Sequence, residues 1–229
     1  MEEKVYQLSK IMKKMTPGEM FNIGPIPVDS TVVNQWMAML VLFALVYLGT
    51  RKLSIRPKGA QVFMELIIQF LYGVMDPALG KENRKFLPLV GSVFLFILTM
   101  NLLWFIPGLI PPTTDLSTTA GLAVATIVTV NIIGVVKKGI GGYVHHFMEP
   151  TPVLAPLNII EELVKPLSLS LRLFGNMFGE KVVVTILFIL VPVLVPTPIM
   201  MLGVLMGVIQ AYVFTLLTVT YLTTSLKGH

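Results

Sequence analysis

Long apolar runs, separated by short polar segments, dominate the chain from Val32 onward. The first run, from Val32 to Thr50, has 19 residues, close to the about 20 that a helix needs to cross a bilayer. Four later runs have similar or greater length. The pattern therefore predicts membrane-embedded helices over 32–50, 86–106, 116–136, 159–191 and 199–226.

Residues 59–79 show a different pattern. Apolar residues recur at helical spacing between Val62 and Val74, while Glu65 and Gln69 lie between them. This spacing is typical of an amphipathic helix that lies along the membrane surface or packs on partner proteins. The expected fold is an all-α integral membrane protein with about five membrane-embedded helices and one amphipathic surface helix.

Basic residues cluster at alternate ends of the apolar runs and indicate an orientation. Arg51 follows the first run and Lys137 follows the third, whereas the segment 107–115 has neither Lys nor Arg. Because cytoplasmic loops are enriched in Lys and Arg, we expect the C-terminus in the cytoplasm and a polar N-terminal arm, 1–31, outside. The lysines of this arm oppose the rule. Residues 32–229 are expected to form a single membrane domain.

The amino-acid composition excludes several classes of function. Hydrophobic residues make up 55% of the 229 positions and charged residues 13%, against about 25% charged in an ordinary soluble domain. Because the basic residues mark helix ends, the net charge of +5 reflects membrane topology, and we expect no nucleic-acid partner. There is no cysteine, and the three histidines lie outside the apolar runs, so we expect neither a metal site nor a cofactor.

One polar stripe interrupts the run over 159–191. Its members lie three or four residues apart and so share one side of a helix: Glu161, Lys165, Ser168, Arg172, Asn176 and Glu180. The stripe extends about 28 Å at about 1.5 Å per residue, close to the thickness of the hydrocarbon core. A polar line of this length either pairs with another helix or faces water.

Arg172 gives the strongest indication of function. A guanidinium keeps its charge at any accessible pH, and burying one near the bilayer centre costs at least about 2.5 kcal/mol. No acidic residue lies within one helical turn of it, so its partner is expected on another chain segment or another protein. Ionisable residues inside membranes mark paths for ions or substrates.

The last apolar run offers a facing surface. Gly203, Gly207, Gln210 and Phe214 share one side of the predicted helix, and two small residues four apart allow a neighbouring helix to approach closely. Packing alone explains the glycines, whereas the amide of Gln210 needs a polar partner in hydrocarbon.

Other polar residues have structural explanations beside the functional ones. Lys165 can form an interfacial ion pair with Glu161 or Glu162 instead of lining a channel. Asn101 and Asp115 bracket the outer end of the first hairpin, where an ion path would open. An acid after two prolines is, however, also a common N-cap of a helix.

Two segments resemble motifs of the a subunit of rotary F-type ATP synthases. Residues 166–176, PLSLSLRLFGN, are similar to the family's central motif, and residues 210–221, QAYVFTLLTVTY, are similar to its last-helix motif. Shorter matches keep the same order along the chain: 100–102, 112–116 and 158–162. The stretch 191–196 is closest to the bacterial and plastid branch.

The resemblance implies a stator beside a rotating ring of c subunits, each of which carries one ion-binding carboxylate. Two offset aqueous half-channels then reach the ring from opposite sides, and the last two helices form a long hairpin against it. The family's essential arginine corresponds to Arg172. The residues expected to translocate the ion are Arg172, Asn176, Gln210, Glu180, Glu161, Glu162 and Ser168, with Asn101 and Asp115 as a candidate channel entrance.

The sequence departs from the family pattern in the outer half-channel. Many members place a carboxylate nine residues after the arginine, where this chain has Lys181, and the acid here is Glu180, one position earlier. The histidine that some members carry seven residues before the glutamine is replaced by Gly203. We therefore expect Glu180 to serve as the outer acid.

The resulting hypothesis is the stator ion-channel subunit of a rotary ATP synthase, conducting H⁺ or Na⁺ across a bacterial plasma membrane rather than a plastid membrane. Its expected partners are the c-subunit ring, peripheral-stalk b subunits and the lipid bilayer. The sequence has no glycine-rich phosphate-binding loop, so ATP chemistry is expected in other subunits.

Two other functions compete with this hypothesis. A secondary transporter could bind an anionic substrate at Arg172, but that class often has internal repeats, and none is visible in the sequence. A structural membrane scaffold would leave the arginine unexplained.

Overall fold

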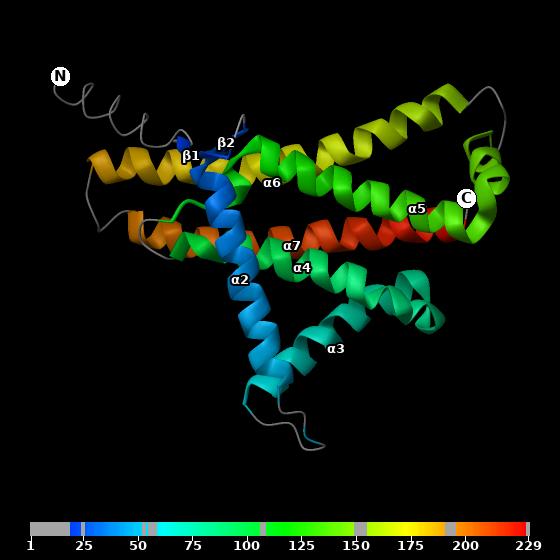
Figure 1. Ribbon diagram of the computed structural model, residues 1–229, viewed down its shortest axis with the longest axis horizontal. Coiled ribbons are helices and arrows are strands. Elements are labelled where there is room, and N and C mark those ends of the chain that lie inside the picture. Colours follow the sequence, from blue (N-terminus) through cyan, green and yellow to red (C-terminus); the bar gives the residue numbers. More distant parts are fainter. Residues whose placement is uncertain are drawn as a thin grey trace.

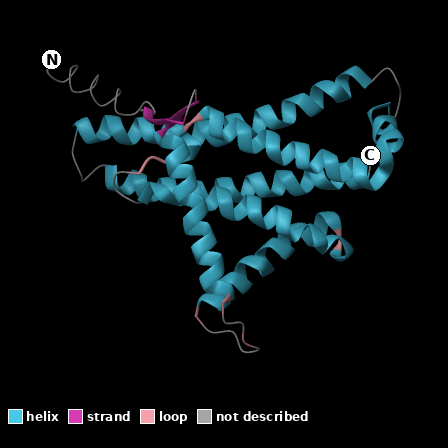
Figure 2. Cartoon of the chain, viewed as in Figure 1, coloured by secondary structure: helices cyan, strands magenta, loops and turns pink. Residues whose placement is uncertain are grey.

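The computed structural model describes residues 19–23, 26–51, 54, 59–105, 109–148, 155–190 and 196–227. Within these residues, six long helices follow a short antiparallel hairpin (Figures 1 and 2). The hairpin pairs β1 (Glu19–Ile23) with β2 (Ile26–Asp29). No strand was predicted in the N-terminal arm, so this small sheet is new.

The helices follow the predicted apolar runs: α2 (Ser30–Thr50), α3 (Ala60–Leu79), α4 (Leu87–Leu102), α5 (Leu116–Met148), α6 (Ala155–Leu190) and α7 (Pro196–Lys227). Short 3₁₀ turns flank α4 and precede α5: η1 (Lys81–Phe86), η2 (Leu103–Phe105) and η3 (Pro112–Thr114).

The predicted all-α membrane fold is confirmed. Among the described residues, five helical stretches are long and apolar enough to cross a membrane: 30–50, 61–79, 81–102, 116–139 and 197–226. None of these five stretches lies in α6. That helix instead carries six charged residues, namely Glu161, Glu162, Lys165, Arg172, Glu180 and Lys181.

The predicted helices over 116–136 and 159–191 leave a loop between them, but the described residues of that segment, 137–148 and 155–158, are helical. α5 continues to Met148 through a kink at Gly139, whose φ is 75°. Glycine adopts positive φ without a steric penalty, so the chain changes direction there and resumes a helix. α6 then begins at Ala155 rather than at residue 159.

The four helices α4 to α7 run side by side along the long axis of the molecule, and α2 runs across them (Figure 1). α2 contacts both α3 and α4. Because α2 and the four long helices point in different directions, they cannot all follow one membrane normal. Some of the membrane-embedded helices are therefore oblique to the membrane normal. The length of the polar stripe on α6 is thus not equal to the depth of membrane that it crosses.

Buried apolar side chains from all six helices form one core. It includes Ala38, Leu71, Ile97, Val130, Leu173 and Phe214, each at most 2% exposed. On α3 the buried apolar residues are Leu71, Met75 and Leu79, whereas Val62 and Phe70 of the predicted apolar stripe are exposed. Of the predicted stripe, only its last member, Val74, packs against the core. That α3 lies along the membrane surface stays a prediction.

Candidate functional site

A side-chain hydrogen bond joins the middle of α6 to the middle of α7. The amide nitrogen Nδ2 of Asn176 donates to Oε1 of Gln210 over 2.7 Å. Gln210 is only 4% exposed, so its amide depends on this partner. The polar partner that the sequence required for Gln210 is therefore Asn176, on the neighbouring helix.

Arg172 lies one turn before Asn176 on α6, and its side chain is exposed at the surface of this chain. It forms no hydrogen bond or ion pair with any residue that the structure describes. The described part of the chain thus supplies no partner for the guanidinium. Ser168, one turn earlier, is exposed as well, so this part of the stripe faces outward.

The N-terminal part of the stripe, near the beginning of α6, forms an ion-pair cluster. Nζ of Lys165 lies 2.9 Å from Oε2 of Glu162 and 3.5 Å from Oε1 of Glu161. The same ammonium lies 5.4 Å from the ring centroid of Tyr221 on α7. The ion pairs that the sequence suggested for Lys165 are therefore confirmed. Their place at a membrane interface and a channel role for the two acids stay predictions.

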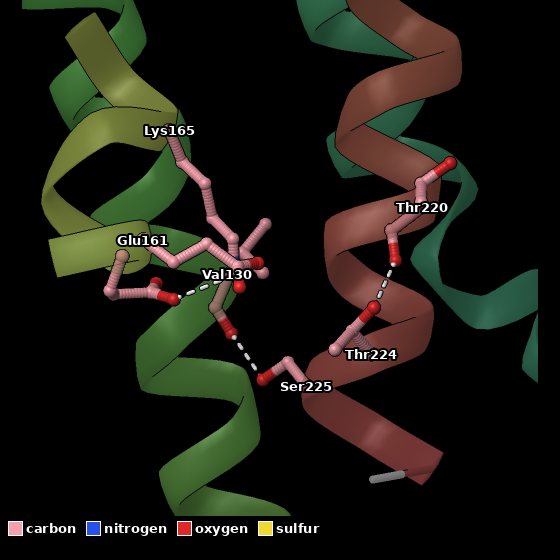
Figure 3. A network of polar contacts seen from close by, with 7 residues as sticks. Val130, Glu161, Lys165, Thr220, Thr224 and Ser225 are labelled. Atoms are coloured by element: carbon pink, nitrogen blue, oxygen red, sulfur yellow. Dashed lines mark hydrogen bonds and ion pairs between the residues drawn. The ribbon is translucent and has the colours of Figure 1, made fainter. Parts of the chain in front are cut away.

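Figure 3 shows how this cluster is held at the junction of three helices. Oγ of Ser225 on α7 donates to the carbonyl oxygen of Val130 on α5, beside the Glu161–Lys165 pair of α6. Tyr221 lies within electrostatic range of Arg172 as well as of the cluster. The sequence pattern places Tyr221 on the same facing side of the last helix as Gln210, which lies 11 residues, or about three turns, earlier, but it did not indicate the contact with Lys165.

At the opposite end of the stripe, Glu180 packs directly on Gly203 of α7. A Cβ built at Gly203 would lie 1.4 Å from Oε1 and 2.0 Å from Cδ of Glu180. The carboxylate therefore occupies the space that any larger residue at position 203 would fill. The acid that lies one position before the family's usual site thus contacts the glycine that replaces the histidine of some family members.

Asp115 caps the beginning of α5. Its Oδ1 accepts a hydrogen bond from the backbone nitrogen of Ser117 over 3.3 Å, and its other oxygen accepts from the Ser117 hydroxyl. Lys181, the other departure from the pattern, is 6% exposed and is attracted electrostatically by Asp115. The capping explanation of Asp115 is thus confirmed, and its place at a channel entrance stays a prediction.

Asn101 connects α4 to α7 and η3. Its Nδ2 donates to the carbonyl oxygen of Gly207 over 3.1 Å, and its Oδ1 accepts from the hydroxyl of Thr113 over 2.9 Å. A Cβ at Gly207 would lie 3.0 Å from Cβ of Asn101, so the glycine permits this close approach. Asn101 is 3% exposed and so lies in the packed interior. Its place at a channel entrance stays a prediction.

We expect Asn101→Leu to destabilise the chain by about 1 kcal/mol, because interhelical hydrogen bonds in membranes each contribute roughly this much or less. The change removes two such bonds at similar side-chain volume. Unfolding in detergent micelles measures it. The matched control is Ser92→Ala on the same helix, whose hydroxyl bonds only to Leu89 of its own helix. Equal stability of the two variants would contradict the prediction.

Polar side chains thus follow one side of α6 and meet α7 at three levels, inside helices that are otherwise apolar. Polar and charged groups arranged in this way define the class of membrane proteins that move ions. The family model described as "ATP synthase A chain" matches residues 32–223.

Individual relatives agree with that match. ATP synthase subunit a of Moorella thermoacetica is 59% identical over 218 residues, which cover 95% of this chain and 100% of the relative. Subunit a 1 of Pelobacter propionicus is 42% identical over 200 residues, 86% and 87% of the two chains. Subunit a 1 of Crocosphaera subtropica is 40% identical over 204 residues, 88% and 89%. The chain therefore belongs to the ATP synthase subunit a family.

This membership confirms the resemblance drawn from the two motifs. The chain is a non-catalytic subunit of the membrane sector of an ATP synthase and functions in ion transport for ATP synthesis. Its apolar helices and its bacterial relatives support a bacterial membrane protein.

Proposed function

We propose that this chain is the stator ion channel of a rotary ATP synthase, leading H⁺ or Na⁺ through two offset half-channels to and from the carboxylates of a c-subunit ring. The observation that supports it best is the exposed guanidinium of Arg172, which has no partner among the described residues. A fixed positive charge on an otherwise apolar surface suits an acidic group on a neighbouring protein.

In this proposal Arg172 forces ion exchange. A positive charge beside the ring favours the ionised carboxylate and repels a bound cation. A carboxylate that approaches must release its ion on one side before passing, and must reload on the other. The same charge opposes direct leakage of ions between the half-channels. The driving force is about 2.3 kcal/mol per charge for each 100 mV of membrane potential.

The remaining stripe residues divide between the two half-channels. Glu180 serves the outer one, with Asn101 and Asp115 toward its entrance. Glu161 and Glu162 serve the inner one.

Near Arg172, the other predicted residues have supporting roles. The Asn176–Gln210 hydrogen bond keeps α6 and α7 at a fixed separation beside the guanidinium. Ser168 lies on the exposed side of α6 with Arg172 and adds a hydroxyl along the inner path.

The partners follow from the exposed surfaces. The c ring covers the side of α6 that carries Arg172, and peripheral-stalk b subunits contact the exposed apolar face of α3, which includes Val62, Leu66 and Phe70. The N-terminus lies outside and the C-terminus in the cytoplasm of a bacterial plasma membrane, as the distribution of basic residues favours.

A comparison of the isolated chain with the assembled complex tests the proposal against a transporter. In liposomes, the purified chain alone is expected to carry neither ions nor organic anions, because the path is complete only beside a ring. The complex is expected to take up ions when ATP is added. Saturable anion uptake by the isolated chain, lost in Arg172→Ala, would instead favour the transporter.

A further inference from the structure

Two buried polar atoms at the outer end of α6 lack hydrogen-bond partners among the described residues. They are Oε1 of Glu180 and Nε1 of Trp104. Leaving a buried donor or acceptor without a partner is costly, and ordered water commonly supplies the missing partner in proteins. One atom is an acceptor and the other a donor, so a single water molecule can serve both.

The two atoms belong to groups that lie together. The indole N–H of Trp104, in η2 after α4, is close enough to the Glu180 carboxylate to interact with it, yet it completes no direct hydrogen bond. The carboxylate rests on Gly203 of α7, where no side chain competes for space. Segments after α4, in α6 and in α7 thus converge on one small polar site.

We propose that Trp104 is a positioning residue of this outer site, and that its indole N–H and the Glu180 carboxylate hold one water molecule between them. The inference rests on the proposed function, in which Glu180 is the outer acid. When a hydronium ion reaches this position, one of its O–H bonds breaks and an O–H bond forms on the Glu180 carboxylate. The resulting water stays bound to the indole N–H.

The chemistry of the indole N–H suits a water oxygen. The indole N–H is only a donor, so it faces the lone pair of a water oxygen and cannot ligate Na⁺. Lys181 and Asp115, which lie near the same end of α6, pair electrostatically with each other.

Trp104→Phe tests the inference, because it keeps an aromatic ring and removes the N–H. In the assembled complex in proteoliposomes, the rate of ATP-driven proton uptake is expected to fall about tenfold, the effect of losing one hydrogen bond to a charged group. In the same variant, the pH on the Glu180 side at which proton uptake is half-maximal is expected to shift. Trp36→Phe is the matched control, since Trp36 is 47% exposed on α2 and its variant should match the wild type.

Further variants separate this inference from the proposed function. Trp104→Tyr retains a donor and is expected to keep more activity than Trp104→Phe, which also answers the case in which the phenylalanine variant fails to assemble. If Glu180→Gln stops uptake while Trp104→Phe matches Trp36→Phe, the role of Trp104 is wrong and the outer acid stands. If Glu180→Gln pumps normally, the outer acid itself is wrong.

Discussion

Replacing Arg172 with alanine is expected to abolish ATP-driven ion uptake by the assembled complex while leaving its assembly intact. An opposite charge nearby favours the ionised form of a carboxylate by about one to three pKa units, so its loss should reduce ion release by roughly 100-fold. Because the side chain is exposed, the substitution removes no hydrogen bond or ion pair within the described residues. Uptake and passive leak are measured together in proteoliposomes, and leak is expected to rise.

Two further variants sharpen this result. Leu171→Ala is the control, because Leu171 is an apolar neighbour on α6 that is 48% exposed and its variant should pump normally. Arg172→Lys is expected to recover only part of the activity, because burial against a partner lowers the pKa of a lysine but not that of an arginine. If Arg172→Ala pumps as well as Leu171→Ala, the guanidinium is not the coupling charge.

A methyl group at position 203 is expected to block the outer half-channel without unfolding the protein. In Gly203→Ala the new Cβ would lie 1.4 Å from Oε1 of Glu180, so the carboxylate must move. Because the clashing atoms are the far end of a flexible side chain, the backbone can stay in place. A displacement of about 1 Å in a reacting group can lower rates by roughly 100-fold, and we expect that loss in ATP synthesis driven by an imposed gradient.

The control for this variant is Gly121→Ala on α5, where a Cβ meets nothing within 4 Å. It should synthesise ATP at the wild-type rate. Stability of both variants in detergent should match the wild type. If Gly203→Ala synthesises ATP normally, Glu180 tolerates displacement and is not the outer acid. If the alanine variant unfolds, the contact between Glu180 and Gly203 is structural.

The sequence predicted the positions of the helices well, but it did not predict which side of each helix is buried. Apolar runs located every long helix, because a spanning helix needs a minimum apolar length. The pattern did not reveal which side of α3 is buried, since lipid is as apolar as a protein core. Leu71 and Phe70 are therefore equivalent in sequence, although the first is buried and the second exposed. The predicted helix ended at residue 136, whereas α5 continues to Met148 across a kink at the non-helical Gly139.

The site was predictable where residues on one helix share a side. Helical spacing placed Glu161, Lys165 and Arg172 together, and it anticipated the ion pairs of Lys165. Contacts between helices were not predictable in this way. Trp104 and Tyr221 are aromatic residues in apolar surroundings, a pattern typical of packing, and only the tertiary arrangement brings them to Glu180 and Lys165.

The outward-facing guanidinium of Arg172 also bears on biogenesis. A newly inserted chain that has not met its partner would present this charge to acyl chains, at a cost of at least about 2.5 kcal/mol. Docking on an acidic neighbour would relieve that cost. Excess copies of the subunit should therefore be short-lived in the cell, and membrane proteases should clear them unless a preformed ring is already there to receive them.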